Sequence, residues 1–142
     1  MRTVSVVGLL TMTAVLLSGC STPQASSASK SATYQTLAAL KAAYTASGST
    51  CSLWIEDDDI QAAAQSGSCG NGITLSTYLT ATDLLGEVKL LRDTASGDDD
   101  TSTPTRTELL IGANWLITGP HVRQLQPKLG GQLAVINPSA AN

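Results

Sequence analysis

The chain has 142 residues, of which 13% are charged, and its formal net charge is −3. A chain of this length is expected to hold one domain once a leader is removed. The sparse and on balance acidic charges argue against a nucleic-acid-binding protein, and they offer no basic cluster for an anionic membrane surface.

Residues 1–19 have the organisation of an export signal. Arg2 supplies a positive start, and an apolar stretch follows it over residues 4–17. This stretch is too short for a transmembrane helix, which needs about 20 apolar residues. Without residues 1–19, seven basic and eleven acidic residues remain, so the exported part has a net charge of −4.

The segment Leu17-Ser18-Gly19-Cys20 resembles the lipobox of bacterial lipoproteins. The resemblance implies that the Cys20 thiol receives a diacylglyceryl group and that a lipoprotein signal peptidase cuts before Cys20. Acyl chains such as palmitate anchor a protein because each buried CH₂ contributes ~0.8 kcal/mol. We therefore expect attachment to the lipid bilayer at the extracytoplasmic face of the cell membrane. A secretory signal with a chance cysteine is the alternative.

The exported part divides by composition. Residues 20–32 are rich in Ser and Ala and are expected to form a flexible stalk. Residues 33–137 are expected to form the domain, and residues 138–142 a tail.

The first helix of the domain is expected over residues 33–46, with Thr33 as its N-cap. Gly48 is its expected stop. One apolar stripe at helical spacing supports this helix: Tyr34, Leu37, Leu40 and Tyr44.

Residues 51–55 then indicate a short strand, and turns are expected around Cys69. The segment 57–65 fits a short helix or an edge strand equally well. Alternating apolar and polar residues over 73–79 predict a second strand.

The second half of the domain begins with a helix that starts at Thr80 or Thr82. The apolar run 109–117 predicts a central strand, with a polar loop before it. A helix opened by Pro120 and a last strand over 132–136 complete the order. The expected fold class is α+β: one small sheet of about four strands, with about three helices on one face, stapled by one disulfide.

That disulfide is predicted between the two remaining cysteines, Cys51 and Cys69, because export exposes them to an oxidising environment. It would contribute roughly 3 kcal/mol of stability. A redox pair or a zinc site is the alternative. However, the two cysteines lack Cys-x-x-Cys spacing, and only His121 could join them as a nitrogen ligand.

No catalytic residue, metal site or cofactor is predicted. His121 is the only histidine and has no Gly-x-Ser-x-Gly motif to accompany it. The acidic runs 56–59 and 98–100 lack the alternating ligands of an EF-hand loop, so solvated charge is the preferred interpretation. Paired carboxylates of a hydrolase are the alternative, since such pairing is spatial.

The segment Gly112-Ala113-Asn114-Trp115 stands out within its apolar run. Asparagine in a central strand needs hydrogen-bond partners, and glycine there indicates a bulge. Asn114 and Trp115 are therefore candidates for a small recognition surface. A bulge with Trp115 in the core is the preferred interpretation.

Residues 34–51, 66–69, 110–115 and 129–131 together resemble a pattern in small lipoproteins and secreted proteins of actinobacteria. In those proteins the third segment often contains Gly-Pro-Asn-Trp, and Ala113 takes the place of the proline here. The resemblance implies the disulfide and a compact α+β domain, and it implies no activity.

Together these features predict a membrane-anchored domain that binds a protein or small ligand in the cell envelope and does not bind nucleic acid. An envelope hydrolase that uses acidic residues and a structural envelope component are the alternatives. A hydrolase would gather carboxylates or His121 in a concave pocket, whereas a binding domain would show a surface patch without converging titratable groups.

Overall fold

The computed structural model describes residues 31–95 and 106–136. This part forms one antiparallel sheet with helices packed against it, so the predicted α+β class is confirmed. In chain order the elements are α1 (Leu37–Ala46), β1 (Trp54–Asp57), β2 (Gln65–Cys69), β3 (Ile73–Thr77), α2 (Ala81–Ala95), β4 (Thr107–Ile111), β5 (Trp115–Thr118), the 3₁₀ turn η1 (Val122–Leu125), α3 (Gln126–Leu129) and β6 (Gln132–Ile136).

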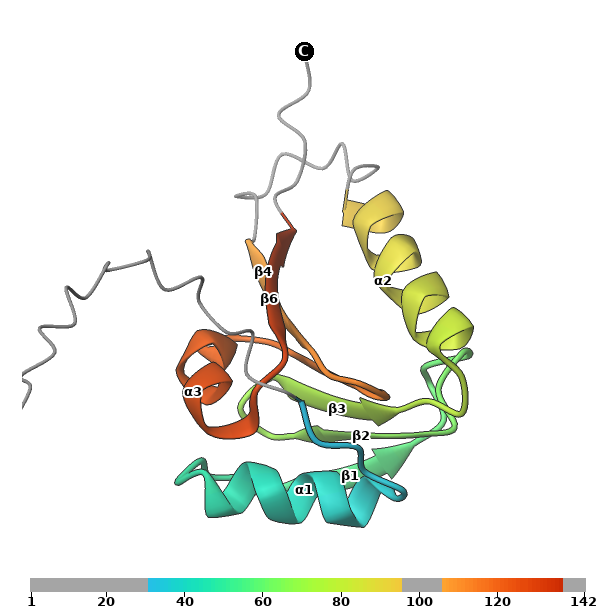
Figure 1. The fold of residues 1–142 in the computed structure, drawn as a ribbon. Helices are drawn as coiled ribbons and strands as arrows, with labels where there is room; N and C mark the ends of the chain where they lie inside the picture. The colour runs from blue at the N-terminus through green and yellow to red at the C-terminus, as the bar shows by residue number, and fades with distance from the viewer. Residues whose placement is uncertain (1–30, 96–105, 137–142) are drawn as a thin grey trace, which may run out of the picture.

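The strands lie in the order β1-β2-β3-β5-β4-β6 (Figure 1). Each neighbouring pair is antiparallel, and β3 and β5 occupy the centre. β1 and β6 are the two edge strands. The described part thus has six strands, where about four were predicted.

One of the two additional strands comes from the run 109–117, which was predicted to be a single strand. The chain reverses within it, so that β4 and β5 form a hairpin. The Gly112 N–H donates to the Trp115 carbonyl at 2.8 Å and closes the turn. Both arms are apolar, and Ala-Asn is not a strong turn pair, so periodicity alone does not reveal the reversal.

The other additional strand is β2, which lies where only turns were expected. Its sequence, Gln-Ser-Gly-Ser-Cys, has few residues that favour strands. It pairs with β1 on one side and β3 on the other. Backbone pairing with these two neighbours therefore makes this segment a strand. The segment 57–65 is neither of the proposed elements, because Asp57 ends β1, Gln65 begins β2, and a loop joins them.

The first helix begins four residues later than predicted. Thr36, not Thr33, is its N-cap, and the Thr36 hydroxyl accepts from the Ala39 N–H at 3.2 Å. Tyr34 therefore lies outside the helix. Leu37, Leu40 and Tyr44 form its buried stripe as predicted.

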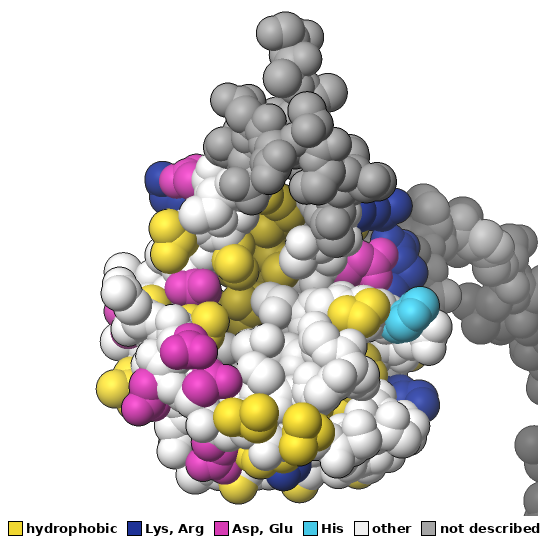
Figure 2. All heavy atoms as spheres, turned by 180° about the vertical axis from the view of Figure 1, so that it is seen from behind, with side chains coloured by type: hydrophobic (Ala, Val, Ile, Leu, Met, Phe, Trp, Pro, Cys, Tyr) yellow, Lys and Arg dark blue, Asp and Glu magenta, His cyan; other side chains and the backbone are white. Residues whose placement is uncertain are grey.

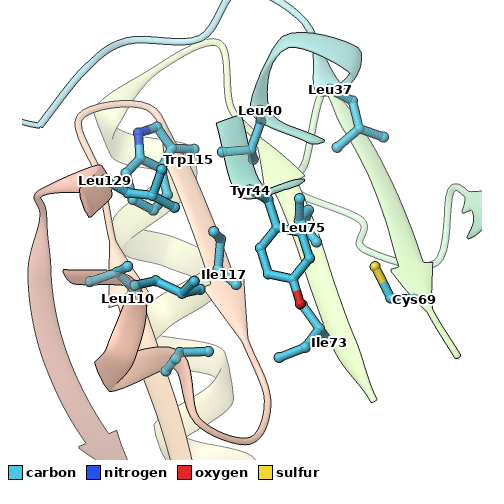
Figure 3. Packing of buried hydrophobic residues seen from close by; sticks show 12 residues of the cluster. Leu37, Leu40, Tyr44, Cys69, Ile73, Leu75, Leu110, Trp115, Ile117 and Leu129 are labelled. Atoms are coloured by element: carbon cyan, nitrogen blue, oxygen red, sulfur yellow. The ribbon is translucent and has the colours of Figure 1, made fainter. Parts of the chain in front are cut away.

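The helices cover both faces of the sheet, so the prediction that all lie on one face is wrong. α1, η1 and α3 pack on the first face, around Leu75, Leu110 and Ile117 (Figure 3). α2 packs on the second face, where Leu109 and Leu116 meet Val88. Successive residues of a strand point to opposite faces, so strands that are apolar at every position need cover on both.

Candidate functional site

The predicted lipidation residue, Cys20, lies outside the described residues, as do most of the expected stalk and the tail. Within the described part, no helix is long and apolar enough to cross a membrane. The described chain begins at Ser31, which lies at the end of the expected stalk.

The predicted disulfide between Cys51 and Cys69 is present, with the two Cα atoms 5.1 Å apart. It joins the chain just before β1 to the last residue of β2. The Tyr44 hydroxyl donates to the Thr50 carbonyl at 3.4 Å beside it. The bridge therefore holds the start of the edge strand against the rest of the sheet.

Asn114, a candidate recognition residue, binds the chain's own backbone. Its Oδ1 accepts from the Tyr34 N–H at 3.0 Å, and its Nδ2 donates to the Tyr34 carbonyl at 2.7 Å. One amide side chain thus pairs with both polar groups of one residue, as a neighbouring strand would. These two bonds hold Tyr34 in place outside the α1 helix.

Trp115, the other candidate, is fully buried in the core of the first face (Figure 3). Its indole N–H donates to the Ala32 carbonyl at 2.8 Å, and its ring lies 5.9 Å from the ring of Tyr34. The Ala113 N–H adds a bond to the Ser31 hydroxyl at 3.2 Å. We call this contact between residues 31–34 and the β4–β5 turn the entry clamp.

Gly112 is the glycine that this clamp requires. A Cβ atom at position 112 would lie 1.9 Å from Cε2 of Trp115, so only glycine lets the indole pack across the turn. The Gly-Ala-Asn-Trp segment therefore supplies two side chains to the clamp: the Trp115 indole, which is in the core, and the Asn114 amide, which is in the turn. Sequence reasoning identified the segment but not its partner, residues 31–34.

The acidic run 56–59 has three parts with different surroundings. The Glu56 carboxylate accepts from the Trp54 indole N–H at 3.2 Å. The Asp57 carboxylate accepts hydrogen bonds from the hydroxyls of Ser66 at 2.9 Å and Ser68 at 3.1 Å. Asp58 and Asp59 are exposed, and no described residue forms a hydrogen bond or ion pair with either side chain. Among the described residues, no group of three or more His, Cys, Asp or Glu side chains is placed to hold a metal ion.

A buried titratable pair lies beneath α2. Tyr78 is 2% exposed, and its hydroxyl has no hydrogen-bond partner in the described part. Burial raises the pKa of Tyr78, and the nearby Glu87 raises it further. Glu87 is also buried, and this burial raises the pKa of its carboxyl group. Both side chains are buried, so they contribute to the packing of α2 and are not accessible to a dissolved ligand.

His121 is exposed and precedes η1 with a left-handed backbone (φ 62°). It is the cyan side chain in Figure 2. Within residues 31–95 and 106–136, no acidic side chain forms an ion pair with it.

The second face of the sheet is only partly covered, because α2 packs over Tyr78 and over residues of β4, β5 and β6. At the other end of the sheet, Leu53 and Ile55 are 57% and 55% exposed. Figure 2 shows acidic side chains gathered toward the lower left of this view, with exposed hydrophobic side chains near them. The exposed surface around Leu53 and Ile55 was not predicted. It exists because β2 lies between β1 and β3, which leaves β1 at the edge of the sheet.

Comparison of the chain with protein-family models, with curated proteins and with solved structures finds no match in any of the three.

Proposed function

We propose that this chain is the precursor of a bacterial lipoprotein, cut before Cys20 and held by lipid at the extracytoplasmic face of the cell membrane. Its domain binds a partner protein in the cell envelope. The observation that carries the anchoring is Leu17-Ser18-Gly19-Cys20 at the end of an apolar stretch that follows Arg2.

Two structural features support this proposal. The Cys51–Cys69 disulfide is of the kind that persists in exported proteins, where thiols are not kept reduced. The entry clamp includes Ser31, so ten residues, 21–30, lie between Cys20 and a residue that is bound to the domain. A fully extended chain of that length spans at most about 36 Å. The tether is therefore short, and the domain acts close to the bilayer.

The test of the anchor compares the full chain with a Cys20→Ala variant in intact bacterial cells. We expect the unaltered chain in the membrane fraction, with a mass that lacks residues 1–19 and includes a diacylglyceryl group. The variant should be uncut or released, because it has no thiol to modify. Ser21→Ala is the matched control and should remain anchored. A Cys20→Ala chain that is still cut and still membrane-bound would refute the lipoprotein assignment.

A further inference from the structure

The outer edge of β1 carries backbone groups without partners. The Gly70 N–H donates to the Leu53 carbonyl at 2.8 Å, so the backbone of residue 53 faces β2. Hydrogen-bonding direction alternates along an antiparallel strand. Ile55 therefore also faces β2, whereas the N–H and C=O groups of Trp54 and Glu56 point away from the sheet. No described residue hydrogen-bonds to these four groups.

The side chains at this edge leave an apolar surface open on one face. Lys41 covers Trp54 on the α1 face, with its Nζ 4.4 Å from the ring centroid. Leu53 and Ile55 point to the opposite face, and each is more than half exposed. α2 does not reach them, because it packs at the other end of the sheet. Exposed apolar residues beside a free strand edge are a template for pairing with another chain.

The charge next to this apolar pair is of one sign. Glu56, Asp57, Asp58 and Asp59 follow Ile55 directly. Asp57 shares the face of Ile55, whereas Glu56 lies on the α1 face, where its carboxylate accepts from the Trp54 indole N–H at 3.2 Å. The basic side chain of Lys41 lies over Trp54, on the other face of the sheet. Hydrogen bonds from Ser66 and Ser68 hold Asp57 in place, so part of this charge is fixed before any partner arrives. The edge is thus apolar at residues 53–55 and acidic at residues 56–59, and this difference sets the direction in which a charged segment can bind along it.

The edge is also held rigidly. The disulfide joins Cys51 to β2, and four residue pairs join β1 to β2. A preorganised edge loses little conformational entropy when it binds. Strand addition to such an edge takes its affinity from backbone hydrogen bonds and its specificity from the flanking side chains.

We propose that the outer edge of β1 is a docking site for an extended segment of a partner protein, with basic residues followed by apolar ones. The segment adds antiparallel to β1 as a further strand of the sheet. Its basic residues lie beside 56–59, and its apolar residues lie beside Leu53 and Ile55. This inference rests on the proposed function in one respect, that the domain acts by binding a protein.

The test uses the full chain as cells make it, in a neutral detergent, and a capped peptide, Lys-Arg-Lys-Arg-Val-Thr-Val. In the antiparallel register its fourth and sixth residues lie opposite Glu56 and Trp54. We expect binding by calorimetry and slower hydrogen exchange at the Trp54 and Glu56 amides. Exchange at the Ile55 amide should not change, because that group already faces β2.

N-methylated peptides separate strand addition from simple charge attraction. Methylation of the fourth and sixth peptide nitrogens removes the two donors that face β1, and we expect binding to weaken about tenfold. Methylation of the third and fifth nitrogens, which point away from β1, adds the same number of methyl groups and should leave the affinity within about twofold. Equal weakening by both peptides would contradict the strand register.

Charge variants test the direction of the segment. Asp58→Asn/Asp59→Asn removes two exposed charges that form no hydrogen bond or ion pair with the described residues, and binding at low salt should weaken roughly fivefold. The matched control, Asp93→Asn/Glu108→Gln, removes the same charge from α2 and β4 and should have little effect. Equal losses in both variants would show attraction to net charge and would overturn the site.

Three further outcomes would also overturn the proposal: no binding of the basic peptide, protection at the β6 edge instead of β1, and self-association of the chain through β1 seen by light scattering. None of them bears on Cys20. If the chain is anchored but does not bind the peptide, the docking site is refuted and the lipoprotein assignment stands. If the chain is not anchored but binds the peptide, the lipoprotein assignment is refuted and the docking site stands.

Discussion

At the scale of single residues, Asn114 shows how a side chain can replace a strand. Its amide pairs with the N–H and C=O of Tyr34, and residues 31–34 need no further strand beside them at this point. Asparagine suits this role because its side chain carries one acceptor and two donors, like a peptide group. The entry clamp thus explains why a polar residue stands between two apolar strands.

Replacement of Asn114 by Ala should lower the free energy of unfolding by about 2 kcal/mol, since two hydrogen bonds of about 1 kcal/mol each are lost. Hydrogen exchange at the Tyr34 amide should become faster, and urea unfolding measures the stability. Asn71→Ala is the control, because Asn71 makes one exposed bond to the Thr50 carbonyl. A loss no greater than that of the control would contradict the clamp.

Folding changes the pKa of Glu87. Burial raises the pKa of its carboxyl group, so the folded state holds the proton more tightly than the unfolded state does. The stability it contributes is therefore highest at low pH and falls as pH rises from about 4.3, the ordinary value for Glu, through the raised pKa. Above that window the folded domain carries a buried charge.

The neutral variant Glu87→Gln should for this reason be more stable than the unaltered domain at pH 7, and the difference should shrink toward pH 4. Thermal unfolding at the two pH values measures it. A variant that is less stable at pH 7 and unchanged at pH 4 would show that ionised Glu87 has a favourable partner.

At the scale of elements, the β4–β5 hairpin depends on Gly112. A methyl group at position 112 would meet the Trp115 indole at 1.9 Å, and neither the turn nor a fully buried indole can move away at low cost. Gly112→Ala should therefore cost about 3 kcal/mol of stability, at the upper end of overpacking effects. Urea unfolding midpoints give the comparison.

Gly86 is the matched control for this substitution. It lies within α2, and nothing lies within 4 Å of a Cβ atom there. Gly86→Ala should stabilise the domain by about 0.5–1 kcal/mol, since alanine favours a helix over glycine. The same chemical change should thus have opposite signs in the two elements, and equal signs would contradict the packing described for Gly112.

At the scale of the whole molecule, the disulfide links the edge strand to the sheet. The sequence separation of Cys51 and Cys69 is 18. Closing such a loop lowers the entropy of the unfolded chain and so raises the free energy of unfolding by about 3 kcal/mol. Cys51→Ser/Cys69→Ser should lower the urea midpoint accordingly. Hydrogen exchange should rise most at β1, because β1 has a neighbour strand on one side only. A uniform rise across the sheet would show that the bridge acts on global stability alone.

The amino-acid sequence by itself determined the features that local chemistry or a regular pattern decides. The pairing of Cys51 with Cys69, the alternating strand β3, the last strand β6 and the buried stripe of α1 follow from residue types and spacing, and the structure contains them. The lipid anchor at Cys20 has the same kind of basis and stays a prediction.

The tertiary structure alone decided the features that depend on residues far apart in the chain. β2 is a strand because β1 and β3 flank it. At the start of α1, Asn114 holds Tyr34 from 80 positions away, and the Gln65 side chain accepts from the Leu37 N–H at 2.9 Å. The helices lie on both faces because β4 and β5 carry apolar residues on both faces. Backbone hydrogen bonds and burial between distant segments have no local sequence signal, so the entry clamp and the open edge of β1 became visible only in the folded chain.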